Sequence, residues 1–303
     1  MSEKEITIVT HNGGFHTDDV FAVATILLSL EKQNGAGANA KILRTRNPED
    51  FATGDYVVDV GGVYDPATNR FDHHQKGGAG KRENGIKYAS FGLVWKKFGK
   101  DICGSEKVAK KVDELLVQPV DAPDNGISIM KPTFYDIFPI DLGLLTFIFK
   151  PTWKEDVSKT DDIFRSLIPY ARGIILRMVN YSKDFIEGQE LVEKSYEETA
   201  DKRLIVTDSG YPWLETLSKH PEPLYVVYYN KRDDTWSIKG IRDNHLSFIY
   251  RKLLPESWAG KNGEELEQAT GVLGGVFCHN HRFMAVNKTK EGILKMAEIA
   301  LNS

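Results

Sequence analysis

The sequence predicts an α/β protein in which a doubly wound, mainly parallel sheet is followed by a smaller α+β domain. Three observations support this prediction. Short β-branched runs alternate with helical periodicities in the first half of the chain. Extended runs joined by polar turns dominate after residue 203. The length of 303 residues is too great for one ordinary core and suits two domains.

The first half of the chain has strand and helix patterns in a β-loop-α order. The expected strands cover residues 6–9, 41–44 and 56–60, and the expected helices cover residues 18–32, 88–98 and 105–117. Thr17 is the expected N-cap of the first helix. In a parallel α/β sheet, ligands bind at the carboxyl ends of the strands. Because His11 and Asp59 each lie at the end of an expected strand, we expect both at that edge.

The second half begins with a long helical pattern and ends in a strand-rich region. The helical pattern covers residues 160–202, and Pro169 is expected to break or kink it. The later runs are two hairpins and a closing helix, after a strand at 204–206: residues 224–228 with 236–238, 276–278 with 283–286, and 288–301. We therefore expect a first domain over residues 1–185, a helical connector over 186–202 and a second domain over 203–303.

Composition and charge exclude several classes of protein. The net charge of −4 argues against a polyelectrolyte binder, so a nucleic-acid substrate would need a local basic patch. Cys103 and Cys278 are far apart in the sequence, which argues against a disulfide framework and a cysteine-ligated zinc. No apolar run approaches the roughly 20 residues needed to span a bilayer. The chain passes from Met1 almost directly into a strand without a signal-peptide pattern, so we expect a cytoplasmic location.

Four segments concentrate histidines and carboxylates. They are His11-Asn12-Gly13-Gly14-Phe15-His16-Thr17-Asp18-Asp19, Val57-Val58-Asp59-Val60-Gly61-Gly62, Asp72-His73-His74 and Pro119-Val120-Asp121-Ala122-Pro123-Asp124. Imidazole and carboxylate ligands without thiolates suit Mn²⁺, Mg²⁺, Zn²⁺ or Fe²⁺. Asp59 is a natural bridge, because one carboxylate can coordinate two ions about 3.5–4 Å apart. Together the segments supply ligands for two divalent ions and indicate metal-assisted hydrolysis.

Each of these residues, taken alone, has an ordinary structural explanation. An aspartate at a strand end is usually a cap or a loop residue, and adjacent histidines in a surface loop are unremarkable. The joint occurrence of all four segments within one α/β pattern is what favours a metal site.

The same segments resemble the DHH phosphoesterase superfamily, and most closely its melanocyte-proliferating-gene family of metal-dependent exonucleases. The matching motifs cover nearly the whole chain: Thr10-His11-Asn12-Gly13, Phe15-His16, Val57-Val58-Asp59-Val60-Gly61-Gly62, Tyr64-Asp65-Pro66, Asp72-His73-His74-Gln75, Val120-Asp121-Ala122, Asp124-Asn125-Gly126, Pro151-Thr152-Trp153, Leu254-Pro255, Trp258, Phe277 and His279. The resemblance implies a metal-binding catalytic domain, followed by a domain that binds the substrate and closes over the metal site.

The resemblance also implies a role for each matching residue. One ion would be held by His11, His16 and Asp59, and the other ion by Asp18, Asp59, His73 and Asp121. Asp59 and His74 would be catalytic, with His74 facing the substrate phosphate. Many superfamily members have an aspartate where this chain has His16, in a loop one residue shorter. This makes the first site richer in nitrogen and shifts the metal preference away from Mg²⁺. We expect two divalent ions as cofactors, Mn²⁺ first, with Mg²⁺, Zn²⁺ and Fe²⁺ as alternatives.

Five other residues of the first domain keep two interpretations. Asp19, Asp72 and Asp124 either orient the metal ligands or serve the fold. Arg44 and Arg46 either line the substrate crevice or are solvated at the end of a strand.

In the second domain, basic residues are the candidates for substrate binding. Arg242 and His279 are expected to contact phosphate groups of the substrate. His281 and Arg282 are expected to lie in an exposed polar turn.

Three functions compete. The first is a metal-dependent phosphodiesterase, with 3'–5' exonuclease activity on RNA or short oligonucleotides favoured. The second is a small-molecule phosphohydrolase acting on pyrophosphate, a cyclic dinucleotide or a phosphorylated metabolite. The third is a binding protein that contains metal and does not turn over, against which the intact ligand sets argue. The sequence predicts no membrane partner and leaves the oligomeric state open.

Overall fold

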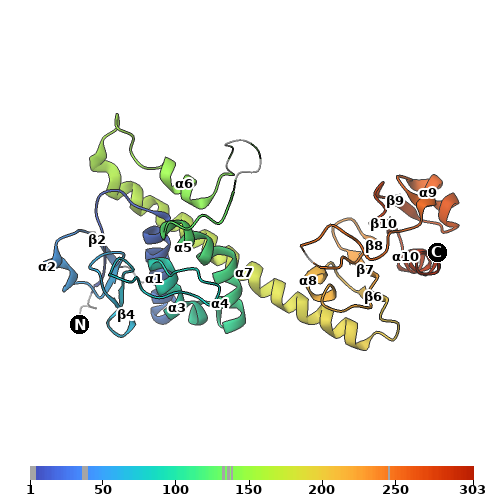
Figure 1. Ribbon diagram of the computed structural model, residues 1–303, viewed down its shortest axis with the longest axis horizontal. Helices are drawn as coiled ribbons and strands as arrows, with labels where there is room; N and C mark the ends of the chain where they lie inside the picture. Colours follow the sequence, from blue (N-terminus) through green and yellow to red (C-terminus); the bar gives the residue numbers. More distant parts are fainter. Residues whose placement is uncertain (1–4, 36–39, 132–133, 135–136, 138, 245) are drawn as a thin grey trace. The chain divides into compact units, whose positions relative to one another are not determined.

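The computed structural model describes residues 5–35, 40–131, 134, 137, 139–244 and 246–303 (Figure 1). The chain divides into two compact units, Met1–Lys183 and Asp184–Ser303. Each unit contains one five-stranded sheet. The α/β fold class predicted from the sequence is confirmed.

The first sheet is mainly parallel, as predicted. Its strand order is β2-β1-β3-β5-β4, from β2 (Ala40–Arg44), β1 (Ile6–Thr10), β3 (Tyr56–Val58), β5 (Arg70–Phe71) and β4 (Tyr64–Asp65). The pairs β1–β2, β1–β3 and β3–β5 are parallel, and only β4 runs antiparallel to its neighbour. Parallel neighbours bring their carboxyl ends to one edge of the sheet. Residues that follow β1, β3 and β5 are therefore brought close together.

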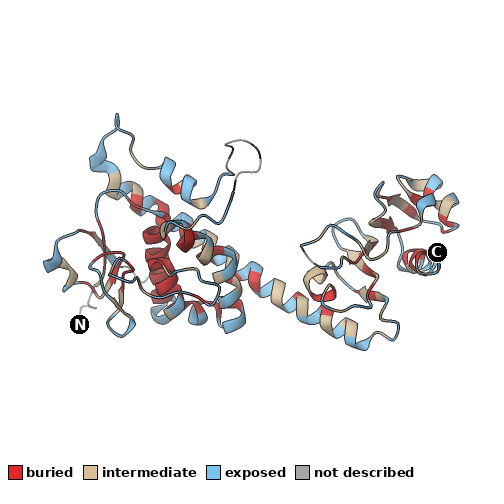
Figure 2. Cartoon of the chain, in the orientation of Figure 1, coloured by how far each residue is buried: buried red, intermediate tan, exposed pale blue. Residues whose placement is uncertain are grey.

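Helix α1 (Thr17–Asn34) is the centre of the first unit. Every residue from Thr17 to Leu30 is buried, which fits a helix that is apolar on nearly all sides (Figure 2). It packs against α3 (Ser90–Cys103), α5 (Gln118–Asp124) and α6 (Leu142–Ile148). The other short elements of this unit are α2 (Pro48–Phe51), η1 (Pro66–Thr68), α4 (Glu106–Val112), η2 (Asp113–Val117) and η3 (Val157–Lys159).

The start of α1 differs by one residue from the expected start. The N-cap is His16, and its N–H donates to Asp19 Oδ1 at 2.8 Å. Thr17, the expected N-cap, lies inside the helix and donates its hydroxyl to Thr146 Oγ1 at 3.0 Å. A contact with α6, which local sequence cannot reveal, therefore takes the hydroxyl that we expected to cap the helix.

Helix α7 (Thr160–Glu198) continues through Pro169 without a break. Of the two expected effects of Pro169, a break or a kink, the break does not occur. Proline removes only one backbone donor, and the buried residues on either side hold the helix together: Phe164, Leu167, Ile168, Ala171, Ile175 and Val179.

No helix in the part of the chain that the structure describes is long and apolar enough to cross a membrane.

The second unit is a smaller α+β domain, as predicted. Its strand order is β6-β7-β8-β10-β9, from β6 (Leu204–Thr207), β7 (Tyr225–Asn230), β8 (Thr235–Gly240), β10 (Met284–Asn287) and β9 (Gly275–Cys278). Only the β6–β7 pair is parallel, and both predicted hairpins are confirmed. The helical elements are α8 (Trp213–Leu217), η4 (Glu256–Trp258), α9 (Gly263–Thr270) and α10 (Lys290–Asn302). Trp258, Tyr225 and Met296 lie in its buried core.

Gly92, in the first turn of α3, is a position where a methyl group would have no room. A Cβ atom there would lie 1.9 Å from Asp121 Oδ2 and 2.8 Å from Arg82 Nη2. Both side chains are buried and paired with each other. We therefore predict that Gly92→Ala lowers the free energy of unfolding by about 1–3 kcal/mol, measured by denaturant titration.

Gly173→Ala in α7 is the matched control, because a Cβ atom there meets nothing within 4 Å. Replacing a helix-interior glycine by alanine without a clash should raise the free energy of unfolding by about 0.5–1 kcal/mol. Equal effects of the two substitutions would contradict the close packing of Gly92 against Asp121.

Candidate metal centre

Asp59 follows β3 at the carboxyl edge of the first sheet. Its backbone has φ 58°, the left-handed conformation that aspartate tolerates better than most residues. Its N–H donates to the Phe71 carbonyl at 3.1 Å, which ties the turn to β5. Gly61 and Gly62 follow with positive φ and complete the turn. A strained, fixed backbone at this point is typical of a functional site.

The carboxylate of Asp59 lies between two histidines. Its Oδ2 is 3.3 Å from His11 Nε2, and its Oδ1 is 3.3 Å from His73 Nε2. The Ser90 hydroxyl also donates to Oδ1 at 3.1 Å. Each oxygen therefore faces a different imidazole, which is the arrangement that a bridging carboxylate requires.

Within the described ranges of the chain, three groups of side chains could each hold a metal ion. They are His11, His16 and Asp59; Asp59, His73 and His74; and Asp18, His73 and Asp124. Within each group, the ligand atoms lie within 4.8 Å of one another. Asp59 belongs to two groups and His73 to two, so the three form one continuous cluster. The structure thus brings together five of the six expected metal ligands: His11, His16, Asp18, Asp59 and His73.

Asp18 is held by the start of helix α3. Its Oδ2 accepts from the Ser90 N–H at 3.1 Å, and its Oδ1 accepts from the Phe91 N–H at 2.7 Å. Backbone donors at a helix N-terminus stabilise a carboxylate and fix its orientation. This buried anchor points Asp18 into the group that contains His73 and Asp124.

Asp121, the sixth expected ligand, is not brought into the cluster. Its Oδ2 pairs with Arg82 Nη1 at 2.8 Å, and its Oδ1 accepts from the Gly92 N–H at 3.0 Å. The neighbouring position in this arrangement belongs to Asp124, whose Oδ2 lies 3.2 Å from His73 Nε2. Both aspartates are on α5. Asp121 pairs with Arg82, whereas Asp124 faces His73.

Two further aspartates support the histidines. Asp19 accepts from the His16 N–H and places its Oδ2 3.1 Å from His11 Nε2. Asp72 Oδ1 lies 2.7 Å from His74 Nδ1 and orients that ring. The His74 side chain is 61% exposed, so its second nitrogen is available at the surface of the cluster.

The two arginines after β2 differ in role. Arg44 is buried, pairs with Asp161 at 2.6 Å and donates to the Gly13 carbonyl at 2.9 Å. It therefore fixes the loop between His11 and His16 and serves the fold. Arg46 is exposed, and its Nη2 lies 3.2 Å from His11 Nδ1 at the border of the cluster.

The carboxylates control the protonation of the buried histidines. Burial alone would lower the pKa of His11, but hydrogen bonds and charges from Asp19 and Asp59 outweigh it and raise this pKa to about 10. Burial is likewise outweighed at His73, whose pKa neighbouring carboxylates raise to about 11. Burial and neighbouring negative charges raise the pKa of Asp18 well above its usual value. The carboxylates thus favour positive charge in the cluster, either as protons on the histidines or as bound cations.

The donor set fits divalent cations. His73 Nε2 and Asp19 Oδ2 are buried and lie 3.1–3.3 Å from oppositely charged side chains, but neither makes a well-aligned hydrogen bond in the part of the chain that the structure describes. A coordinated cation would satisfy buried ligand atoms of this kind. Nitrogen and carboxylate ligands without thiolates suit Mn²⁺, Mg²⁺, Zn²⁺ or Fe²⁺. His11 Nδ1, 3.1 Å from the Asn12 carbonyl, can donate there and leave Nε2 free to coordinate.

The expected substrate-binding residues Arg242 and His279 belong to the second unit. The Arg242 guanidinium lies 4.7 Å from the centre of the Phe248 ring and 5.3 Å from that of Tyr250. Tyr250 stacks on Phe283 at 5.5 Å, and Phe283 lies 4.3 Å from the His279 ring. These five residues form one row of contacting side chains, which we call the aromatic row.

His281 and Arg282 were expected in an exposed polar turn. His281 meets this expectation fully, and Arg282, which is half-buried, meets it only in part. His281 is exposed. Arg282 has φ 56° and places its guanidinium 3.3 Å from the Leu254 carbonyl, where it donates a hydrogen bond. Arg282 therefore has a structural role in the turn.

The chain matches a known protein family over nearly its whole length. The family model MYG1_exonuc, described as "Uncharacterised protein family (UPF0160)", matches residues 7–301. The chain belongs to this MYG1 family. The expected relationship to the melanocyte-proliferating-gene family is confirmed at this level.

Relatives of this MYG1-family chain align over nearly its full length. The MYG1 exonuclease of Homo sapiens is 32% identical over 332 residues, which are 97% of this chain and 85% of the relative. The MYG1 protein of Saccharomyces cerevisiae is 31% identical over 334 residues, which are 99% of this chain and 97% of the relative. The MYG1 exonuclease of Mus musculus is 30% identical over 97% of this chain and 84% of the relative.

Two contributors to the MYG1-family site were not singled out from the sequence. Ser90, which donates to Asp59, is an ordinary serine with no motif around it. Arg82, which forms an ion pair with Asp121, lies in a loop whose course the sequence pattern does not define. The signal for Asp124 was present, because it shares one helical turn with Asp121.

The contrast between Asp124 and Asp121 is testable by metal binding. We predict that Asp124→Asn weakens Mn²⁺ affinity at least about tenfold, measured by calorimetric titration, because it removes a charged ligand next to His73. Asp121→Asn should change Mn²⁺ affinity far less and should instead lower the free energy of unfolding by about 1–3 kcal/mol, since it leaves Arg82 less well paired. A larger loss of affinity in Asp121→Asn than in Asp124→Asn would restore Asp121 as the ligand.

Proposed function

We propose that this protein is a metal-dependent phosphodiesterase with 3'–5' exonuclease activity on RNA or short oligonucleotides. The observation that carries the proposal is the Asp59 carboxylate, which faces His11 with one oxygen and His73 with the other. Such a shared carboxylate inside a buried, acidic cluster suits two neighbouring divalent ions. Relatives that carry the name MYG1 exonuclease support the same reaction class.

The Asp72-His73-His74 motif supports membership of the DHH superfamily. Its three residues have three separate positions in the structure. His73 lies inside the ligand cluster, Asp72 is buried beside it, and His74 is mostly exposed. This division into a ligand, an orienting carboxylate and an accessible imidazole is what a phosphoesterase site needs.

We assign one ion to His11, His16 and Asp59, and the other to Asp18, Asp59, His73 and Asp124, with Asp124 in place of Asp121. Two bound ions of this kind supply Lewis acidity and lower the pKa of a coordinated water. Mn²⁺ is the proposed metal because the ligand set combines carboxylates, which suit Mn²⁺ and Mg²⁺, with imidazoles, which shift the preference away from Mg²⁺.

The chain's own residues position the substrate. Asp72, which lies 2.7 Å from His74 Nδ1, favours the doubly protonated ring and raises the pKa of His74. The exposed Nε2–H can then donate to a phosphate oxygen and hold the phosphodiester against the cluster. Asp19 and the Asn12 carbonyl keep the His11 ring in one orientation.

The aromatic row of the second unit favours a nucleic-acid substrate. Single-stranded nucleic acids are held by aromatic rings on which bases stack, together with arginine. Phe248 at one end of the row is 81% exposed, and Arg242 stacks beside it. We therefore propose residues 203–303 as the substrate-binding domain, residues 1–185 as the catalytic domain and residues 186–202 as the connector.

A panel of substrates tests the proposed function. RNA and DNA oligonucleotides labelled at the 5' or the 3' end, a cyclic dinucleotide and pyrophosphate are each incubated with Mn²⁺ and with Mg²⁺. The proposal expects stepwise shortening of RNA from its 3' end, with Mn²⁺ giving the higher rate. Hydrolysis of pyrophosphate or the cyclic dinucleotide alone would favour a small-molecule phosphohydrolase, and no hydrolysis at all would favour a binding protein.

Asp59→Asn should abolish most of the turnover while the fold is retained. Asparagine tolerates the left-handed backbone that Asp59 adopts, but it brings no charge to either ion. Because charge stabilisation by the ions is worth several kcal/mol, we expect kcat to fall about 100-fold or more. Asp65→Asn on β4, outside the cluster, is the control and should keep the wild-type rate. An Asp59→Asn protein with near wild-type turnover would show that the bridge is wrongly assigned.

Arg242→Ala and His279→Ala should separate substrate binding from metal binding. Because one stacking contact is worth about 1–3 kcal/mol, each change should lower kcat/KM on oligonucleotides about tenfold. Bis-p-nitrophenyl phosphate has no bases to stack and should be affected less. Metal content, checked by elemental analysis, should be unchanged.

Arg232→Ala is the matched control, because this arginine is 92% exposed on the turn between β7 and β8. Equal losses on both substrates would point to a direct catalytic role for Arg242 or His279. A loss of metal would mean that the site extends further than the cluster.

A further inference from the structure

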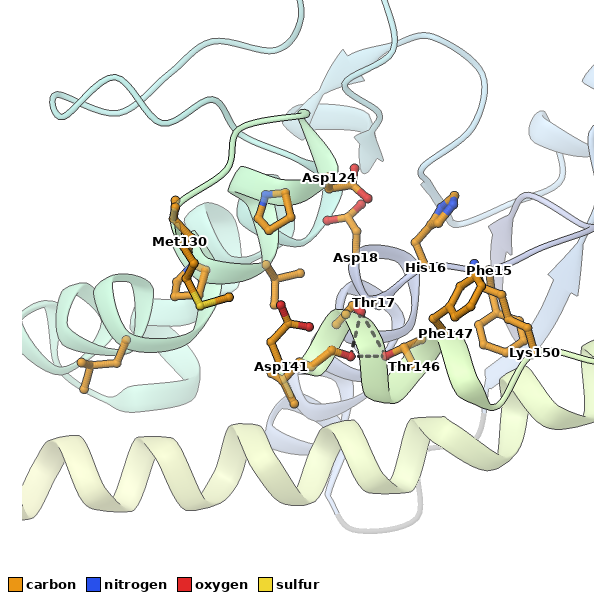
Figure 3. Close-up of a pocket in the computed structure, with 17 residues that line it drawn as sticks. Phe15, His16, Thr17, Asp18, Asp124, Met130, Asp141, Thr146, Phe147 and Lys150 are labelled. Carbon is orange, nitrogen blue, oxygen red and sulfur yellow. Dashed lines mark hydrogen bonds between the residues drawn. The ribbon is translucent and has the colours of Figure 1, made fainter. Parts of the chain in front are cut away.

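A pocket of about 510 Å³ opens beside the metal centre within the first unit (Figure 3). Three members of the ligand cluster line one part of it, namely His16, Asp18 and Asp124. Figure 3 shows the carboxyl groups of Asp18 and Asp124 directed toward one another at this end of the pocket. The volume falls within the range of roughly 300–1,000 Å³ that is usual for small-ligand sites.

The remaining lining of the pocket is largely apolar. It comes from the segment around α5 and from α6, and includes Leu115, Val120, Pro123, Ile129, Met130 and Phe147. Phe147 is 63% exposed and Ile129 is 47% exposed, although both are large apolar residues. An apolar surface that is left open next to a charged centre suits a ligand with one charged end and one flat apolar end.

Two threonine hydroxyls fix α6 to α1 beside this pocket. Thr17 Oγ1 donates to Thr146 Oγ1 at 3.0 Å and lies 3.3 Å from the Leu142 carbonyl. These contacts join the helix that carries Asp18 to the helix that carries Phe147. The apolar wall and the metal ligands are therefore held in one arrangement.

Lys150 adds a positive charge at the same pocket. Its Nζ lies 5.5 Å from the centre of the Phe147 ring and 5.8 Å from that of Phe15. Partial burial lowers the pKa of Lys150, while the charges of Asp19 and Asp124 oppose this effect. The ammonium group is thus close enough to the acidic centre to interact with an anion bound there.

We propose that this pocket binds the nucleoside next to the scissile phosphate, with Phe147 stacking on the base and Lys150 pairing with the phosphate. The inference rests on the proposed phosphodiesterase function and names the part of the first unit that recognises the nucleotide. Phe147 and Lys150 are positioning residues in this account, because they contact the base and the phosphate while the ligand cluster faces the reacting atoms.

The test uses binding of adenosine 5'-monophosphate and of inorganic phosphate to the Mn²⁺-loaded protein, measured by calorimetric titration. Phe147→Ala should weaken adenosine monophosphate binding about tenfold and leave phosphate binding within about twofold, since only the nucleotide has a base to stack. Phe149→Ala is the matched control, because Phe149 is 50% exposed two residues away and does not line the pocket. Phe147→Trp keeps an aromatic ring at this position and should bind adenosine monophosphate about as tightly as the wild-type protein.

Lys150→Met should weaken both ligands about fivefold or more, because it removes a charge and keeps the aliphatic part of the side chain. Lys154→Met is its control, since Lys154 lies over the exposed Trp153 ring and outside the pocket. Equal nucleotide affinities in Phe147→Ala and Phe149→Ala would overturn the pocket assignment.

The two proposals fail separately. If oligonucleotides are hydrolysed but the Phe147 and Lys150 variants keep wild-type nucleotide affinity, the pocket assignment is wrong and the phosphodiesterase stands. If these variants lose nucleotide affinity as expected but the wild-type protein cleaves no phosphodiester, the pocket is a nucleotide site and the phosphodiesterase is wrong.

Discussion

The contact of one carboxylate with two histidines is the constraint on which the first unit depends. Asp59 follows the middle strand, β3, and its oxygens meet His11 from the end of β1 and His73 from the end of β5. Parallel pairing of these three strands is what brings the three residues to one edge. The left-handed turn at Asp59 and the two glycines after it complete the geometry at a cost of about 1–2 kcal/mol.

The same edge holds more buried negative charge than the fold alone would favour. Burial raises the pKa of Asp18 and Asp19, so their charged forms are costly without a cation. Backbone donors at the start of α1 and α3 hold these two carboxylates in place. This arrangement costs local stability unless a cation binds, so metal binding should be coupled to the stability of this unit.

Much of the fold follows from short-range patterns, whereas the ligand set depends on long-range contacts. Short β-branched and extended runs identified the strands in both halves of the chain, and the hairpins followed from their polar turns. These patterns did not show which of Asp121 and Asp124 faces His73. Both lie on α5, and the structure pairs the first of them with Arg82, which comes from a distant loop. The N-cap of α1 differed for the same reason, since Thr146 takes the Thr17 hydroxyl.

The charge of the cluster also orders the events at the proposed site. A group of buried carboxylates repels a phosphodiester, so an anionic substrate can approach only after cations have reversed the local charge. The positive groups at its border, Arg46, His74 and Lys150, are few, and the whole chain carries a net charge of −4. Much of the substrate affinity must then come from surfaces that add apolar and stacking contacts to these few charges. The apolar pocket beside Phe147 and the aromatic row beside Arg242 are surfaces of that kind, and both suit stacked bases. An enzyme built in this way would recognise nucleotides mainly through their bases and would use the phosphate mainly for chemistry.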